Sequence, residues 1–150
     1  MENISKESLI DTNILIYANN KDSPYHEPSK GLVENALNGD IEAALSTQNL
    51  VEFYAIITDK KRLEHPLSPK RAKELVEFYC ENKFLKVISP LPETITTPAD
   101  LIEKHEPIGQ AIFDFLLVAT MKDHAISQIY TSNDRHFRIF DFLKIINPLS

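Results

Sequence analysis

Short apolar runs alternate along this chain with longer segments whose apolar residues recur every three or four positions. The short runs predict strands at residues 8–10, 43–46, 84–88, 128–131 and 143–146. The longer segments predict helices at residues 26–37, 47–61, 68–79 and 110–124, with a shorter helix that begins at residue 98. Residues 14–18 are read either as a helix or as a continuation of the first apolar run. Strands that alternate with helices favour an α/β sandwich around a mainly parallel sheet.

Length and composition are those of one ordinary globular domain, which we expect to span residues 1–150. No apolar run reaches the roughly 18 residues that a membrane span needs, and the N-terminal residues lack the order of a signal peptide. Cys80 is the only cysteine, so neither an internal disulfide nor a thiolate metal cage can form. We therefore expect a cytoplasmic protein that does not associate with membranes.

The net charge of −6 argues at first against a nucleic-acid partner, because phosphate binding usually leaves a basic footprint. The charge is nevertheless uneven, and it includes local basic clusters at Lys60-Lys61-Arg62, Lys70-Arg71 with Lys73, and Arg135 with Arg138. An acidic protein can hold RNA if metal ions mask some of its carboxylates. The alternative is that these residues are solvated surface charges. With only 3 glycines, the chain has no glycine-rich phosphate cradle.

Asp114 is the most informative carboxylate, because apolar residues surround it from Ala111 to Val118. An ionised carboxylate that is buried without a partner costs several kcal/mol or more. None of its helical neighbours at three and four residues is basic. A divalent cation is one source of compensation. The alternatives are an exposed position on the helix or an ion pair with a distant Arg.

Three other carboxylates stand in comparable places. Asp11 follows the first predicted strand, although Asp is also favoured as a helix N-cap. Asp134 follows the strand at 128–131 but could simply cap a short helix, and Glu52 lies on a helix where it could be solvated. Ligands of parallel sheets bind beyond the carboxyl ends of the strands. If the four converge, their hard oxygen atoms suit Mg²⁺ or Mn²⁺ better than zinc.

Four segments of the chain, in order, resemble the acidic motifs of PIN-domain proteins, especially VapC-type toxin ribonucleases of type II toxin–antitoxin systems. They are residues 9–18 (LIDTNILIYA), 50–54 (LVEFY), 113–120 (FDFLLVAT) and 129–137 (IYTSNDRHF). The last motif can be registered so that either Asn133 or Asp134 takes the acidic position, and we favour Asp134. The third motif contains fewer alanines than is usual in the family.

The resemblance implies a three-layer α/β/α sandwich and Mg²⁺- or Mn²⁺-dependent cleavage of RNA phosphodiester bonds. Asp11 and Asp114 would be direct metal ligands, and Glu52 and Asp134 would complete the site. Hydrogen bonds that orient these groups would come from residues beside them: Thr12, Asn13, Thr131, Ser132 and Asn133. We expect phosphate contacts from the basic residues Lys60, Lys61, Arg62 and Arg135.

The same resemblance implies a cognate VapB-like antitoxin, whose tail would block the acidic groove, and a homodimer. Two other functions remain open. The chain could be a PIN-domain nuclease of RNA processing that has no antitoxin, or a catalytically silent PIN-like module for protein interaction. A phosphatase that uses Asp11 as nucleophile normally has a second Asp two residues on, where this chain has Asn13.

Overall fold

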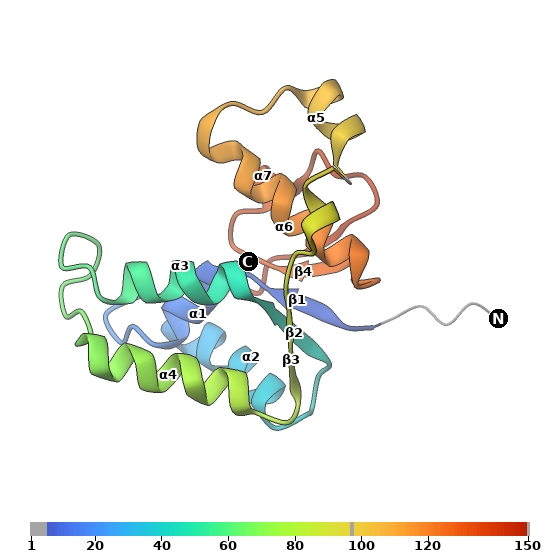
Figure 1. Cartoon of the computed structure of the whole chain (residues 1–150). Helices are drawn as coiled ribbons and strands as arrows, with labels where there is room; N and C mark the ends of the chain where they lie inside the picture. The colour runs from blue at the N-terminus through green and yellow to red at the C-terminus, as the bar shows by residue number, and fades with distance from the viewer. Residues whose placement is uncertain (1–5, 97, 150) are drawn as a thin grey trace.

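The computed structural model describes residues 6–96 and 98–149, whose strands form one five-stranded parallel sheet (Figure 1). The strands are β1 (Ser8–Ile10), β2 (Ala43–Ser46), β3 (Leu85–Ile88), β4 (Gln128–Tyr130) and β5 (Lys144–Ile146). Their order across the sheet is β3-β2-β1-β4-β5, and every neighbouring pair is parallel. The predicted α/β class with a parallel sheet is therefore confirmed.

The helices lie close to the predicted segments. They are α1 (Thr12–Ala18), α2 (His26–Leu37), α3 (Thr47–Ile57), α4 (Pro69–Glu81), α5 (Ala99–His105), α6 (Ile112–Asp123) and α7 (Asp134–Phe137), with 3-10 turns η1 (Pro92–Thr96) and η2 (Gly109–Ala111). Helix α3 ends earlier than predicted, because the Asp59 side chain accepts the Lys61 amide and competes with helical hydrogen bonding. Among the described residues, no helix is long and apolar enough to cross a membrane.

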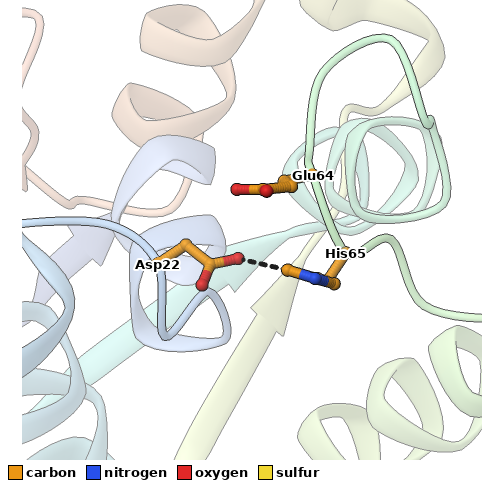
Figure 2. Close-up of side chains that lie close together, drawn as sticks. All are labelled: Asp22, Glu64 and His65. Carbon is orange, nitrogen blue, oxygen red and sulfur yellow. Dashed lines mark hydrogen bonds and ion pairs between the residues drawn. The ribbon is translucent and has the colours of Figure 1, made fainter.

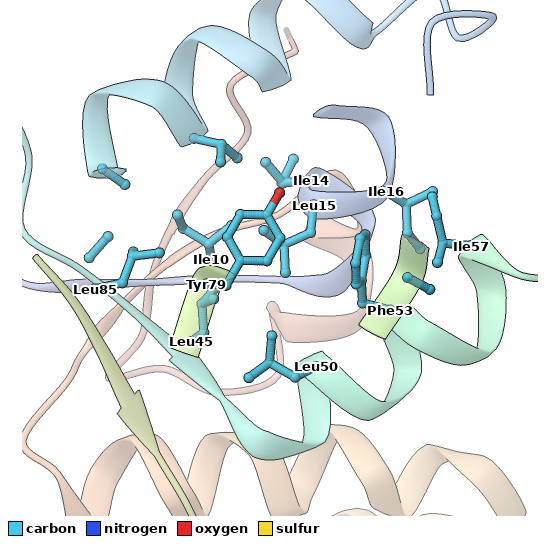
Figure 3. Packing of buried hydrophobic residues seen from close by; sticks show 14 of the residues in the cluster. Ile10, Ile14, Leu15, Ile16, Leu45, Leu50, Phe53, Ile57, Tyr79 and Leu85 are labelled. Atoms are coloured by element: carbon cyan, nitrogen blue, oxygen red, sulfur yellow. The ribbon is translucent and has the colours of Figure 1, made fainter. Parts of the chain in front are cut away.

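Two apolar cores lie on opposite faces of the sheet. Successive strand residues point to opposite faces, so Leu9 packs in one core and Ile10 in the other. The core that includes Ile10 lies beneath α1 to α4 and contains the rings of Phe53 and Tyr79, 5.9 Å apart (Figure 3). The core that includes Leu9 lies beneath α6 and contains Phe115. The predicted three-layer α/β/α sandwich is confirmed.

The connections from β1 determine where a site can form. β1 is the central strand, and its neighbours β2 and β4 lie on either side of it. The strand order changes direction at this point, and in open parallel sheets ligands bind outside the carboxyl ends of the strands at such a point. The Asp11 amide donates to the Tyr130 carbonyl at 2.9 Å, so the ends of β1 and β4 are held together.

Candidate metal centre

Asp11 is the first residue after β1 and the N-cap of α1, with extended backbone angles (φ −72°, ψ 157°). Its buried carboxylate accepts hydrogen bonds from the Thr12 amide at 2.9 Å and the Thr131 hydroxyl at 2.8 Å. Longer bonds come from the side-chain amides of Asn13, at 3.2 Å, and Asn49, at 3.4 Å. The two interpretations of Asp11 are thus compatible, because the same carboxylate caps the helix and faces the end of the sheet.

Among residues 6–96 and 98–149, no basic side chain forms an ion pair with Asp11. Burial is the largest influence and raises the pKa of Asp11 to about 6, although the hydrogen bonds from Thr131 and Thr12 act in the opposite direction. The negative charges of Glu52 and Asp114 raise this pKa further. Repulsion between these three carboxylates is the electrostatic situation that a hard divalent ion relieves.

Glu52 lies on α3, where a chain of buried polar groups fixes one of its oxygens. The Thr12 hydroxyl donates to Glu52 Oε2 at 3.1 Å, while Asn49 Nδ2 donates to the same Thr12 oxygen at 2.9 Å. Because that oxygen receives the Asn49 amide, the Thr12 proton is directed at Glu52. Asn49 itself is fully buried and is held by the Ser46 hydroxyl, which donates to its Oδ1 at 2.8 Å.

Gln48 holds the other oxygen of Glu52. Its Nε2 donates both to Glu52 Oε1, at 3.1 Å, and to the backbone carbonyl of Phe113, at 3.1 Å. This bridge joins α3 to the start of α6. Gln48 and Asn49 are not among the residues predicted from the sequence, although both are polar amides one helical turn before Glu52. Their position on the same helix face as Glu52 is the signal from which the sequence could have indicated them.

Asp114 lies in the first turn of α6 and is only partly buried. Burial raises its pKa above the ordinary value, and the charge of Glu52 acts in the same direction, whereas His136 lowers it. His136 Nδ1 lies 3.5 Å from Asp114 Oδ2. The basic neighbour of Asp114 is therefore a histidine from α7, and the distant Arg that the sequence left open is not its partner.

A hollow of about 300 Å³ collects these groups. The three carboxylates of Asp11, Glu52 and Asp114 line it together. Thr12 and Asn13, expected to orient them, line it as well. Thr131 lies behind Asp11 and also accepts the Asn133 amide at 3.0 Å, and the Ser132 amide donates to Asn13 Oδ1 at 3.2 Å.

The two candidates for the fourth acidic position, Asn133 and Asp134, lie in different places. Asp134 does not line the hollow, and Asn133 does. Helix α7 begins at Asp134, so its carboxylate turns along the helix to Arg138, 2.7 Å away, while the residue just before the helix faces the site. The backbone amide of Asp134 and the side chain of Arg138 hydrogen-bond to the Asp134 carboxylate, and these bonds lower its pKa. Asn133 thus lines the hollow beside the three carboxylates and Asp134 does not, so the hollow holds one charge fewer than it would with Asp134 in that place.

Only one of the four basic residues that were predicted to contact phosphate lies at the hollow. Arg62 lines the hollow, whereas Lys60, Lys61 and Arg135 are exposed and do not line it. Arg62 and the two lysines belong to the turn that follows α3, in which the Arg62 amide donates to the Asp59 carbonyl at 3.0 Å.

A second group of possible metal ligands lies outside this hollow. Asp22, Glu64 and His65 have ligand atoms within 4.8 Å of one another, and all three are exposed (Figure 2). His65 Nδ1 lies 2.8 Å from Asp22 Oδ2, a contact that raises the pKa of His65. This surface ion pair joins the loop after α1 to the loop after α3, and it explains the proximity of Asp22 and His65 without a metal.

Comparison with known proteins extends over almost the whole chain. The profile of the PIN domain family matches residues 8–143. Ribonuclease VapC48 of Mycobacterium tuberculosis is 29% identical over 140 residues, which cover 93% of this chain and 96% of that protein. The structure of M. tuberculosis VapC20, described as a sarcin-ricin loop cleaving toxin, aligns with a TM-score of 0.65 at 15% identity over 88% of this chain and 94% of that one. VapBC2 from Rickettsia felis, bound to a DNA fragment from its promoter, aligns with a TM-score of 0.64 at 19% identity, covering 94% and 98% of the two chains. At these identities the two structures bear on the fold alone.

Proposed function

The chain belongs to the PIN domain family, and from that membership we propose that it is a metal-dependent endoribonuclease, the toxin of a VapBC-type toxin–antitoxin pair. One observation carries the proposal. Three carboxylates from separate elements line one hollow at the end of the sheet, and the most buried of them, Asp11, has a pKa raised to about 6. A catalytically silent interaction module would have no need to maintain this repulsion.

The residues of the hollow fit a magnesium or manganese ion. Their donors are carboxylate and amide oxygens, which both ions prefer over the nitrogen and sulfur donors of zinc sites. We propose that Asp11 and Asp114 hold the ion directly, and that Glu52 and Asn133 complete the site. A bound divalent ion offsets the carboxylate charges, attracts the phosphodiester and acidifies the attacking water.

The surrounding residues would keep the carboxylates in place. Thr131 and Asn13 hold Asp11 Oδ2, and the Thr12 hydroxyl holds Glu52 Oε2 by donating a hydrogen bond to it. Groups that orient metal ligands commonly change metal affinity or activity by about 10- to 100-fold when they are removed. Their role here would be to fix the carboxylates before RNA arrives.

The direct test is cleavage of RNA by the purified protein in Mg²⁺, with EDTA as the control. We expect cleavage to stop in EDTA and to return when Mg²⁺ is restored in excess. Cleavage that persists in EDTA would contradict the proposal. An RNA-cleaving protein without any antitoxin would instead be the RNA-processing nuclease that the sequence left open.

Arg62 is the basic residue that we propose to contact the RNA backbone beside the cleaved bond, because it lines the hollow with the carboxylates. We expect Arg62→Ala to raise KM several-fold and to reduce the slope of log KM against log salt by about one. Lys61→Ala removes the same charge one residue away and should leave both KM and its salt dependence unchanged. Equal effects of the two variants would show that only the overall charge matters.

We further propose a VapB-like antitoxin partner, a homodimer of this chain and a cytoplasmic location, where RNA is available. The support for the partner is that a structure of the same fold, which aligns with 94% of this chain, is described as a toxin–antitoxin complex from Klebsiella pneumoniae. Light scattering should give the isolated chain about twice its 17.1 kDa mass, and a larger complex when it is co-expressed with the product of a neighbouring gene. A mass of 17.1 kDa at micromolar concentration would exclude the dimer.

A further inference from the structure

A second and larger hollow, of about 710 Å³, continues from the metal centre and shares Glu52, Ile56 and Asp114 with it. Its walls are mainly apolar and come from α3, η2, α6, α7 and the segment after α7. Ile56, Phe113 and Ile139 form much of this surface. The side chain of Phe113 is 50% exposed and that of Ile139 is 39% exposed. Large apolar side chains gathered around a hollow, rather than scattered singly, indicate a binding surface.

The side chains of these walls are poorly suited to a phosphate and better suited to a flat ligand with an apolar face. No Lys or Arg of residues 6–96 and 98–149 lines this hollow, so it is poorly suited to a phosphate. An aromatic ring and aliphatic side chains suit a flat ligand with an apolar face. Gln110 and His136 also line it and offer hydrogen-bonding groups to the polar edge of such a ligand.

The position of Phe113 is coupled to the metal centre. Gln48 donates to the Phe113 carbonyl and to Glu52 through the same Nε2 atom, at 3.1 Å in each case. Phe113 also directly precedes Asp114 in the chain. The aromatic surface is therefore held at a fixed place relative to two of the carboxylates.

We propose that this hollow binds the nucleobase of a nucleotide that adjoins the cleaved phosphodiester, with the base stacked on Phe113. The inference rests on the proposed ribonuclease function, because it is the phosphate at the metal centre that brings a base to this place. Only one ribose separates a base from its phosphate, and the two hollows share three lining residues, Glu52, Ile56 and Asp114. The antitoxin tail that would block the acidic groove is the competing occupant of these apolar walls, and the experiment below distinguishes it from a nucleobase.

Phe113→Ala tests this proposal with RNA oligonucleotides that contain one cleavage site. In one RNA both nucleotides beside the cleaved bond carry their bases, and in two others the nucleotide on one side or the other is abasic. We expect Phe113→Ala to lower kcat/KM about tenfold on intact RNA, mainly through KM, which is a common magnitude for the loss of one stacked base. The wild type should lose a similar factor on RNA that is abasic on one side of the cleaved bond. The variant should lose nothing further on that RNA, and Phe113→Tyr should restore most of the activity.

Phe78→Ala is the matched control, because Phe78 is 53% exposed on α4 and lines neither hollow. It should retain wild-type kinetics, and thermal unfolding of both variants checks that they are folded. Equal cleavage of intact and abasic RNA by the wild type would overturn the proposal. So would a Phe113→Ala variant that cleaves normally but binds an antitoxin peptide less tightly, because the hollow would then belong to a protein partner. If the wild type cleaves no RNA at all, the proposed function itself fails and this inference fails with it.

Discussion

Replacing Asp114 with Asn is expected to lower Mg²⁺-dependent RNA cleavage by at least about a hundredfold. The reason is that the substitution preserves the size of the side chain but removes one of the three charges that line the hollow. Loss of a group that merely orients a metal ligand costs up to about a hundredfold, so the loss of a ligand should cost no less. The measurements are kcat/KM on an RNA with one cleavage site and the dissociation constant of Mn²⁺ by isothermal titration.

Asp134→Asn provides the control for this result, since it is the same chemical change outside the hollow. Asp134 pairs with Arg138 at the surface, and such solvent-exposed ion pairs contribute little to stability. We expect Asp134→Asn to remain within about twofold of the wild type in cleavage, and to bind Mn²⁺ normally. A loss as large as that of Asp114→Asn would restore Asp134 to the metal centre and contradict the register seen in the structure.

The fold was largely predictable because its signals are local. Each strand is a short apolar run, and α2 and α4 have helical spacing and clear starts, such as Ser68 before Pro69. The order of the strands is different, because it depends on where each crossover helix returns to the sheet. Nothing in the sequence of β4 states that it pairs with β1 and not with β3.

The site was predictable only where a carboxylate conflicts with its immediate surroundings. Asp11 and Asp114 stand among apolar residues, so the free-energy cost of burying their charges could be inferred from the sequence. The choice between Asn133 and Asp134 depends on the residue at which α7 begins, which neighbouring hydroxyl and amide residues leave open. The contacts of Asn49 with Thr12 and of His136 with Asp114 join residues 37 and 22 positions apart, where short-range patterns carry no information.

Asp11 should make the metal-free protein lose stability as the pH rises from about 4 to about 6. Its pKa is raised from 3.8 to about 6 in the folded chain, so in this range the folded state binds more protons than the unfolded state. The free energy of unfolding then falls with increasing pH, by up to about 3 kcal/mol for a shift of this size, and the loss persists at higher pH. The partly buried Asp114, whose pKa is also raised, acts in the same direction.

Urea unfolding in EDTA at pH 4 and pH 7 measures the effect, with Asp11→Asn as the comparison that removes the titrating group. We expect Asp11→Asn to be more stable than the wild type at pH 7, because the variant has no buried charge at this position. The gain should be about 1–2 kcal/mol, smaller than the full effect of the charge, because an amide cannot accept all the hydrogen bonds that the carboxylate accepts. At pH 4 this advantage should be largely lost. Mg²⁺ should stabilise the wild type at pH 7 but not Asp11→Asn, since an ion that binds only the folded state shifts the unfolding equilibrium. A difference between the two proteins that is independent of pH would mean that the charge of Asp11 is already compensated within the chain, and the physical reason for a metal at this site would be lost.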